Sequence, residues 1–263
     1  MGLGNSPLVA RHPRAHDKPD FSLVPTRAGG CVVVFHEVWG LVEHTKDVCK
    51  RVSKLGFAAT APNLYAGYDD VLTPSNIQRA MEGVWKLTLE ERRDKDKVAR
   101  TLAKKGVGER TKEVVAILYD QGFRDKLLER AVSAVDGASS KFKGVSTLGF
   151  CLGGGLSMKT ATKGRRLSSA ISFYGEPPPS SDVRYITSPI LAIYASKDDV
   201  INSKVPAFVE AMIGGGKDLT LKTYPNTLHG FFNDARKAVY NRRAAAEAWD
   251  ITAWFLERTL GKL

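Results

Sequence analysis

Short apolar runs alternate with longer segments of helical periodicity along most of the chain, and this alternation is the feature that most limits the fold. The run CVVVF at 31–35 is continuously apolar and rich in β-branched residues, which is typical of a strand covered on both faces. Strand–helix alternation predicts an α/β fold, a mostly parallel twisted sheet flanked by helices. The other predicted strands are Phe57–Ala61, Val145–Gly149, Ser169–Tyr174, Pro189–Tyr194 and Leu219–Tyr224, and the predicted helices are His44–Leu55, Leu127–Asp136, Leu152–Thr162, Ser203–Ile213 and Lys237–Thr259.

The length of the chain suits one large domain rather than two small ones. We expect a single α/β domain over residues 1–263, with a polar lead-in at 1–30. Residues 87–126 interrupt the alternation, because they are charged and helix-prone and contain no convincing strand. We interpret them as a helical insertion. Three roles for it stay open: a cap over the functional site, a surface excursion and a dimer contact.

Cysteine usage and hydropathy restrict the compartment. The three cysteines, Cys31, Cys49 and Cys151, have no paired spacing, which argues against a disulfide framework and favours a reducing compartment. No apolar run approaches the ~20 residues needed to span a bilayer, and residues 1–20 hold no apolar core of signal-peptide length. We therefore expect a cytoplasmic protein with no membrane partner.

The charge is strongly positive, with 39 basic and 28 acidic residues and a formal net charge of +11. Such a field attracts nucleic acids, membrane surfaces or anionic ligands. The basic residues are nevertheless spread along the chain and mixed with acids, as in residues 89–106, and no nucleic-acid-binding motif accompanies them. A solvated charged surface is therefore favoured over a nucleic-acid site, and attraction of an anionic small molecule stays open.

The stretch 145–162 carries the clearest chemical motif. An apolar run leads into Gly149-Phe150-Cys151-Leu152-Gly153, and a helix-compatible segment follows. This is the pattern of a nucleophile elbow, with cysteine in place of serine. The nucleophile lies on a sharp turn, so the residues two before and two after it must be small. The partial positive charge at the N-terminus of the following helix favours the thiolate.

This stretch has two other interpretations. It is also compatible with a glycine-rich turn that buries a structural cysteine. A nucleotide-binding loop is less compatible, because the stretch lacks both the GK[ST] ending of a phosphate-binding loop and the G-x-G-x-x-G spacing of a dinucleotide fold. The choice depends on whether partner residues follow in the chain.

A histidine and an acid follow Cys151 in the order that this type of elbow requires. His229 is the only histidine after the cysteine, and it lies after the predicted strand Leu219–Tyr224, where a general base is expected. Asp198 and Asp199 follow the preceding predicted strand. We favour Asp198 as the acid that orients the imidazole, because its spacing places it in the turn.

The loop after the first long strand supplies two further candidates. In this fold that loop provides the second backbone donor for an oxyanion, here the N–H of Val38, and the N–H of Leu152 provides the first. Glu37 lies beside them, although on the residues alone it is compatible with an ordinary loop acid. The His36-Glu37 pair does not complete an HExxH zinc motif, because Gly40 occupies the second histidine position.

Together these pieces resemble the dienelactone hydrolase (carboxymethylenebutenolidase-like) family of the α/β-hydrolase fold. The resemblance rests on FHEVWGLVEHTKDVCKRVSKLGFAATAPNLY at 35–65, the GFCLGG elbow, SFYG at 172–175, ASKDDVI at 195–201 and LHGF at 228–231. It extends to the C-terminal helix and covers about two-thirds of the chain.

The resemblance implies an enzyme that hydrolyses an ester or lactone through a triad of Cys151, His229 and Asp198 and an acyl-thioester intermediate. It implies that Glu37 contacts the resting thiol and helps to form the thiolate when substrate binds. It implies no metal and no organic cofactor, and a small ester or lactone as the binding partner, whose anionic character stays open.

The chain departs from the family at the substrate-binding arginines. Well-studied members bind a substrate carboxylate with an arginine four residues after the catalytic histidine, where this chain has Asn233. Arg236 and Arg79 are the substitute candidates, and the dienelactone substrate itself is in doubt. The alternative function is a non-catalytic or redox-sensing binding protein on the same fold, because an activated thiol is readily oxidised.

Overall fold

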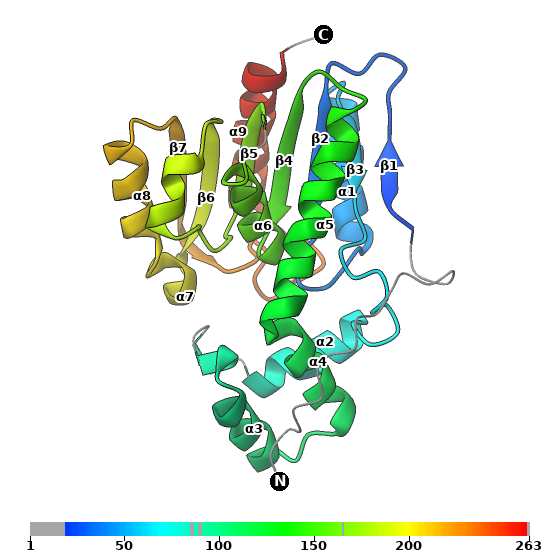
Figure 1. Ribbon diagram of the computed structural model, residues 1–263, viewed down its shortest axis with the longest axis vertical. Coiled ribbons are helices and arrows are strands. Elements are labelled where there is room, and N and C mark those ends of the chain that lie inside the picture. Colours follow the sequence, from blue (N-terminus) through cyan, green and yellow to red (C-terminus); the bar gives the residue numbers. More distant parts are fainter. Residues whose placement is uncertain (1–18, 85–86, 89–90, 165, 262–263) are drawn as a thin grey trace.

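The computed structural model describes residues 19–84, 87–88, 91–164 and 166–261. Within them a twisted seven-stranded sheet has the order β1-β3-β2-β4-β5-β6-β7 (Figure 1). β1 pairs antiparallel with β3, and all other neighbours are parallel. This confirms the predicted mostly parallel sheet flanked by helices. The strands are β1 (Phe21–Leu23), β2 (Cys31–Phe35), β3 (Ala58–Ala61), β4 (Val145–Phe150), β5 (Ser169–Phe173), β6 (Ile190–Lys197) and β7 (Leu219–Leu228).

Helices cover both faces of the sheet, and alternate residues of β2 enter the two resulting cores. Val33 and Phe35 pack in one core, whereas Val32 and Val34 pack in the other. Helices α5, α6 and α8 lie over the first face, and α1 and α9 lie over the second (Figure 1). No described helix is long and apolar enough to cross a lipid bilayer. The helices are α1 (Glu43–Lys54), α2 (Pro74–Val84), α3 (Lys95–Lys104), α4 (Glu109–Tyr119), α5 (Gln121–Ser139), α6 (Leu152–Ala161), α7 (Asp199–Asn202), α8 (Val205–Gly214) and α9 (Arg242–Leu260), with 3₁₀ turns η1 (Glu91–Arg93) and η2 (Ser180–Tyr185).

Some elements differ from the sequence predictions. Strand β1 lies inside the predicted polar lead-in, whose first eighteen residues are outside the described part. It is a three-residue edge strand that depends on pairing with β3, so its own pattern is too short to identify it. Helix α2 was not predicted, although Ile77, Ala80, Met81 and Val84 repeat at helical spacing and are buried.

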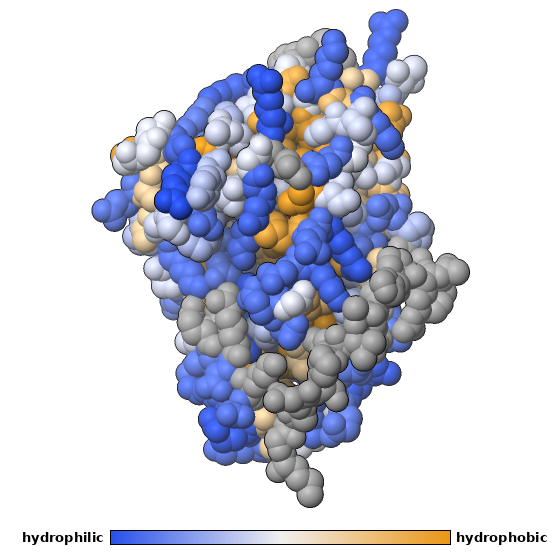
Figure 2. All heavy atoms as spheres, viewed as in Figure 1, coloured by the Kyte–Doolittle hydropathy of each residue, from blue (hydrophilic) through white to orange (hydrophobic). Residues whose placement is uncertain are grey.

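The predicted insertion at 87–126 contains η1, α3, α4 and the first residues of α5, while residues 89–90 lie outside the description. Its apolar side chains, among them Val98, Leu102, Val114 and Leu118, are buried in the same core as α2 and β2. In Figure 1, α2, α3 and α4 form a group beyond the carboxyl ends of the parallel strands. The visible outer side of this group is mainly hydrophilic (Figure 2).

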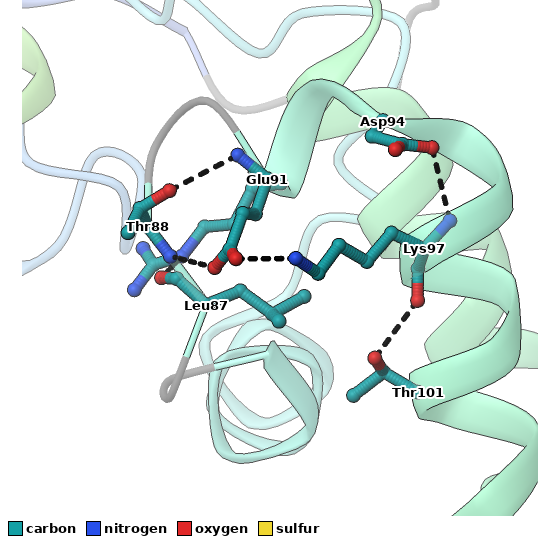
Figure 3. A network of polar contacts seen from close by, with 7 residues as sticks. Leu87, Thr88, Glu91, Asp94, Lys97 and Thr101 are labelled. Carbon is teal, nitrogen blue, oxygen red and sulfur yellow. Dashed lines mark hydrogen bonds and ion pairs between the residues drawn. The ribbon is translucent and has the colours of Figure 1, made fainter.

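Reciprocal capping fixes the beginning of the insertion (Figure 3). The hydroxyl of Thr88 accepts from the backbone N–H of Glu91, and the carboxylate of Glu91 accepts from the backbone N–H of Thr88. Lys97 forms an ion pair with the same carboxylate, while Asp94 accepts from the backbone N–H of Lys97 as the N-cap of α3. The capping residues thus set where the polypeptide turns into α3.

Candidate active site

Cys151 occupies a strained bend between β4 and α6. Its φ of 54° and ψ of −116° lie outside the regions that a side chain with a Cβ favours. The bend is held by a 2.9 Å hydrogen bond from the backbone N–H of Cys151 to the carbonyl of Phe173 on β5. The thiol is partly exposed. This geometry matches the sharp strand-to-helix turn that the Gly-x-Cys-x-Gly pattern predicts.

The two glycines of the pattern are required by close backbone contacts. A Cβ on Gly149 would overlap the carbonyl group of Gly153. A Cβ on Gly153 would overlap the carbonyl of Phe35 and lie 2.6 Å from the carbonyl oxygen of His36. The start of α6 therefore lies directly against the end of β2 and the loop that follows it, which carries Glu37.

His229 and Asp198 meet beyond the ends of β7 and β6. Nδ1 of His229 lies 2.6 Å from Oδ2 of Asp198, a buried carboxylate. Because a carboxylate accepts hydrogen bonds, this contact places a proton on Nδ1 and leaves Nε2 for another partner. Asp199 is exposed in the short helix α7. The structure thus brings Asp198, the favoured candidate, to the imidazole.

Burial, Cys151 and Asp198 together determine the charge of His229. Burial favours the neutral imidazole, but the charge of Cys151 and the side-chain hydrogen bonds with Asp198 and Cys151 act in the opposite direction. Together they raise the pKa of His229 to about 10. The sulfur and the imidazole are therefore neighbours, and the site favours an imidazolium beside the sulfur.

Glu37 is buried and is held by two neutral donors. The hydroxyl of Tyr174 donates to one carboxylate oxygen at 3.2 Å, and Nδ2 of Asn233 donates to the other at 2.5 Å. Burial, with the charges of Glu37 and Cys151, raises the pKa of Tyr174 well above its usual value. Its ring lies 5.0 Å from the ring of His229. Tyr174 therefore remains a neutral donor between Glu37 and the Cys151–His229 pair.

Sequence reasoning did not identify Tyr174 and Asn233 as partners of Glu37. They lie 137 and 196 positions away along the chain. The available signals were indirect: Tyr174 directly follows β5 at the carboxyl edge of the sheet, and Asn233 lies four residues after His229.

The two expected oxyanion donors border the elbow. Leu152 is the first residue of α6, so its N–H has no acceptor within the helix. Val38 follows Glu37 in the loop that packs against Gly153. Each N–H is thus carried by a segment that touches the bend at Cys151.

The two candidate arginines are placed differently. Arg236 donates to the carbonyl of His229 at 3.5 Å and its guanidinium lies 5.5 Å from the ring of Trp39. Arg236, Trp39 and Asn233 line a cavity of about 440 Å³. Arg79 is exposed on α2 and donates to Asn76 of the same helix at 3.5 Å. The structure therefore brings Arg236 to the backbone of His229 and leaves Arg79 outside this cavity, whose lining does not include Cys151.

Helix α4 borders the site from the insertion. Burial raises the pKa of the Tyr119 hydroxyl, Arg92 acts against this shift, and the charge of Cys151 adds to it, so Tyr119 lies within electrostatic reach of the sulfur. Arg92 donates to the hydroxyl of Tyr119 at 3.3 Å, and that hydroxyl lies 3.9 Å from Sδ of Met81.

No group of three or more histidine, cysteine, aspartate or glutamate side chains in the described part of the chain is arranged to hold a metal ion.

Comparisons with known proteins agree with this architecture. The model of the dienelactone hydrolase family matches residues 21–260. A protein of Saccharolobus solfataricus named "Putative carboxymethylenebutenolidase" is 36% identical over 242 residues, which cover 90% of this chain and 93% of that protein. A crystal structure of a dienelactone hydrolase-like promiscuous phosphotriesterase from metagenomic libraries superposes with a TM-score of 0.65 at 18% identity, over 89% of this chain and 88% of that one. The predicted family is confirmed: the chain belongs to the dienelactone hydrolase family of carboxylic ester and lactone hydrolases.

Proposed function

We propose that this hydrolase uses Cys151 as its nucleophile, His229 as its general base and acid, and Asp198 as the group that orients the imidazole. One observation carries the proposal: a cysteine at a strained strand-to-helix bend raises the pKa of a histidine that also bonds a buried carboxylate. A structural cysteine in an apolar core lacks these partners, as Cys31 and Cys49 illustrate.

The reaction follows from the geometry in two steps. The Cys151 thiolate attacks the ester or lactone carbonyl, and the N–H groups of Leu152 and Val38 stabilise the oxyanion. The C–O bond then breaks, and the imidazolium of His229 gives its proton to the leaving alkoxide. An acyl-thioester remains. Water, deprotonated by His229, attacks this thioester, and the acid leaves with regeneration of the thiolate.

Glu37 acts on the thiol before the first step in this proposal. Its carboxylate is held by Tyr174 and Asn233 beside the loop that touches the elbow. A substrate that enters the site changes the contacts of this carboxylate and promotes transfer of the thiol proton to His229, which gives the thiolate and the imidazolium of the first step. The contribution of Asn233 is distinctive, because its neutral amide binds Glu37 and supplies no positive charge to a substrate.

Arg236 is the substrate-binding residue in this proposal, and Arg79 is not. Arg236 contacts the carbonyl of His229 and lines a cavity together with Trp39, whose ring lies 5.5 Å from the guanidinium. It offers a planar donor to a carboxylate or another polar group on the substrate. The net charge of +11 also favours the approach of an anionic substrate.

The insertion acts as a cap in this proposal. Tyr119 of α4 lies within electrostatic reach of Cys151, and the apolar side chains of α3 and α4 are continuous with the core beneath α2. A packed helical group beyond the carboxyl edge of a parallel sheet covers the place where such sheets bind ligands. This favours a cap over a surface excursion.

A hydrolysis panel tests mechanism and substrate class together. Paired esters and lactones, with and without a free carboxylate, are assayed with the parent, Cys151→Ala, Arg236→Gln and the matched control Arg79→Gln. We expect Cys151→Ala to abolish hydrolysis and Arg236→Gln to raise KM for carboxylate substrates only. Hydrolysis by Cys151→Ala at the parental rate contradicts the nucleophile, and equal effects of the two arginine variants contradict the assignment of Arg236. A parent that hydrolyses nothing but binds a partner on oxidation supports the redox-sensing alternative.

A further inference from the structure

His36 is a completely buried histidine that the mechanism above does not use. It directly follows β2, and its Nδ1 lies 2.7 Å from the carbonyl oxygen of Glu37. A carbonyl oxygen only accepts hydrogen bonds, so Nδ1 must carry the proton and donate it. The side chain is therefore in a defined tautomer and binds the backbone of the loop rather than solvent.

The peptide unit that His36 binds is the unit that carries the N–H of Val38. The carbonyl of Glu37 and the N–H of Val38 share one planar trans peptide, in which C=O and N–H point in opposite directions. Fixing the direction of the carbonyl consequently fixes the direction of the N–H. Among the residues that the structure describes, this N–H has no hydrogen-bond acceptor, so it is available to a ligand.

The hydrogen bond from His36 also alters the strength of this donor. A bond to the carbonyl oxygen polarises the peptide unit and makes its N–H a better donor. The carbonyl of Glu37 additionally accepts from the N–H of Gly40 at 3.1 Å, which closes the turn. The hydrogen bond from Gly40 fixes the backbone of the turn. His36 gives the same carbonyl oxygen a second donor, which is carried by a rigid, buried ring.

Tyr65 supports the same loop from the neighbouring strand–helix connection. Its ring packs edge-on against His36, with centroids 4.8 Å apart and an interplanar angle of 72°. Its hydroxyl donates to the carbonyl of Val38 at 2.9 Å. Two successive peptide units are thus each held at the carbonyl oxygen, and the N–H of Val38 belongs to the first of them.

The loop is pressed against the elbow. The carbonyl groups of Phe35 and His36 contact Gly153 so closely that no Cβ fits there. The pKa of the Tyr65 hydroxyl is raised, mainly by burial and in addition by the charge of Cys151. Tyr65 and Cys151 therefore interact electrostatically. The loop and the sulfur therefore share one small region at the end of β2 and β4.

We propose that His36 is a positioning residue of the oxyanion hole: by donating to the carbonyl of Glu37 it orients and polarises the peptide whose N–H, at Val38, stabilises the oxyanion. Tyr65 supports this peptide indirectly: by donating to the carbonyl of Val38 it holds the next peptide unit, and so the loop on the other side of Val38, in place. This inference rests on the proposed Cys151 mechanism. It predicts a defect in acyl transfer and none in the reactivity of the thiolate.

Two reactions of the same sulfur separate these effects. Hydrolysis of p-nitrophenyl acetate passes through an oxyanion, whereas alkylation by iodoacetamide displaces iodide from a saturated carbon and forms none. The variants are His36→Leu, which removes the donor, His36→Asn, whose amide retains an N–H donor at the position of Nδ1, and Tyr65→Phe, which removes only the hydroxyl.

We expect His36→Leu to lower kcat by about 10- to 100-fold, less than or equal to the loss of an entire oxyanion donor. KM and the alkylation rate should stay within about two-fold of the parent, because the thiolate itself is untouched. His36→Asn should recover most of the lost kcat, and Tyr65→Phe should lower kcat in the same selective way.

A folded His36→Leu variant with parental kcat overturns the inference. An equal loss of hydrolysis and alkylation also overturns it, because the variant would then act on the thiolate. If His36→Leu does not fold, Tyr65→Phe decides the matter by the same comparison of the two reactions. Failure of the proposed function is distinguishable, because it appears as parental ester hydrolysis in Cys151→Ala.

Discussion

Iodoacetamide alkylates thiols, and we expect it to distinguish the three cysteines of the native protein. Cys31 and Cys49 differ from Cys151 in their solvent exposure and in their surroundings. Burial raises the pKa of both Cys31 and Cys49 from 9.0 to about 12, and each side chain is almost inaccessible to solvent. Since the thiolate is the nucleophile, a rise of three units reduces its fraction at neutral pH by about 1,000-fold relative to a thiol with the ordinary value. Cys151 is partly exposed, with an imidazolium beside it.

The assay is a time course at pH 7.5 with limiting iodoacetamide, acid quenching, digestion and quantification of the three cysteine peptides by mass spectrometry. We expect Cys151 to react at least about 1,000-fold faster than Cys31 or Cys49. The same reaction in guanidinium chloride is the control, because unfolding should make all three thiols react at similar rates.

Similar rates for the three thiols in the native protein would refute this reasoning, and so would faster labelling of a buried cysteine. The His229→Ala variant adds a second check. Removing the imidazolium should slow alkylation of Cys151 while leaving the other two rates unchanged.

Three further predictions concern the groups around the sulfur. Glu37→Gln should leave the melting temperature within a few degrees of the parent but lower kcat, and a pH–rate profile identical to that of the parent would contradict its role. Asp198→Asn should lower kcat by about 10²- to 10⁴-fold, whereas the control Asp199→Asn should not, as steady-state kinetics on the same ester will show. Burial favours neutral His229 and the charge of Cys151 opposes it, so Cys151→Ala should lower the pKa of His229 from about 10, which NMR of labelled histidine measures. Because the folded-state pKa is raised, the imidazolium stabilises the parent fully below about pH 6.5 and loses this contribution as the pH rises through about 10.

The sheet was predictable because its strands carry local signals. The continuous apolar run at 31–35 became β2 without change, and the predicted β4 and β5 differ from the observed strands by one residue at one end. Strands β6 and β7 extend beyond their predicted ends, because their last residues are held by pairing across a register shift, with Lys197 opposite Leu228. Pairing between distant segments has no signature in the local pattern.

The elbow was predictable for a similar reason, since Gly149, Cys151 and Gly153 are neighbours in the sequence and their spacing reflects one steric requirement. The partners of Glu37 were not. Tyr174 and Asn233 meet it because the carboxyl ends of several strands converge, and their positions after β5 and after His229 indicate the region but not the hydrogen bonds to Glu37. The role of His36 was not predicted either, because the His36-Glu37 pair was considered only as part of an incomplete zinc-binding motif.

The most direct test of the account is the identity of the acylated atom during turnover. The protein is mixed with p-nitrophenyl acetate, quenched in acid within a turnover, digested and analysed by mass spectrometry, with hydroxylamine treatment to identify thioesters. We expect one acetyl group on Cys151, bound through sulfur, and none in Cys151→Ala. An acetyl group on another residue, or full turnover by Cys151→Ala with no acyl-protein, would contradict the central claim.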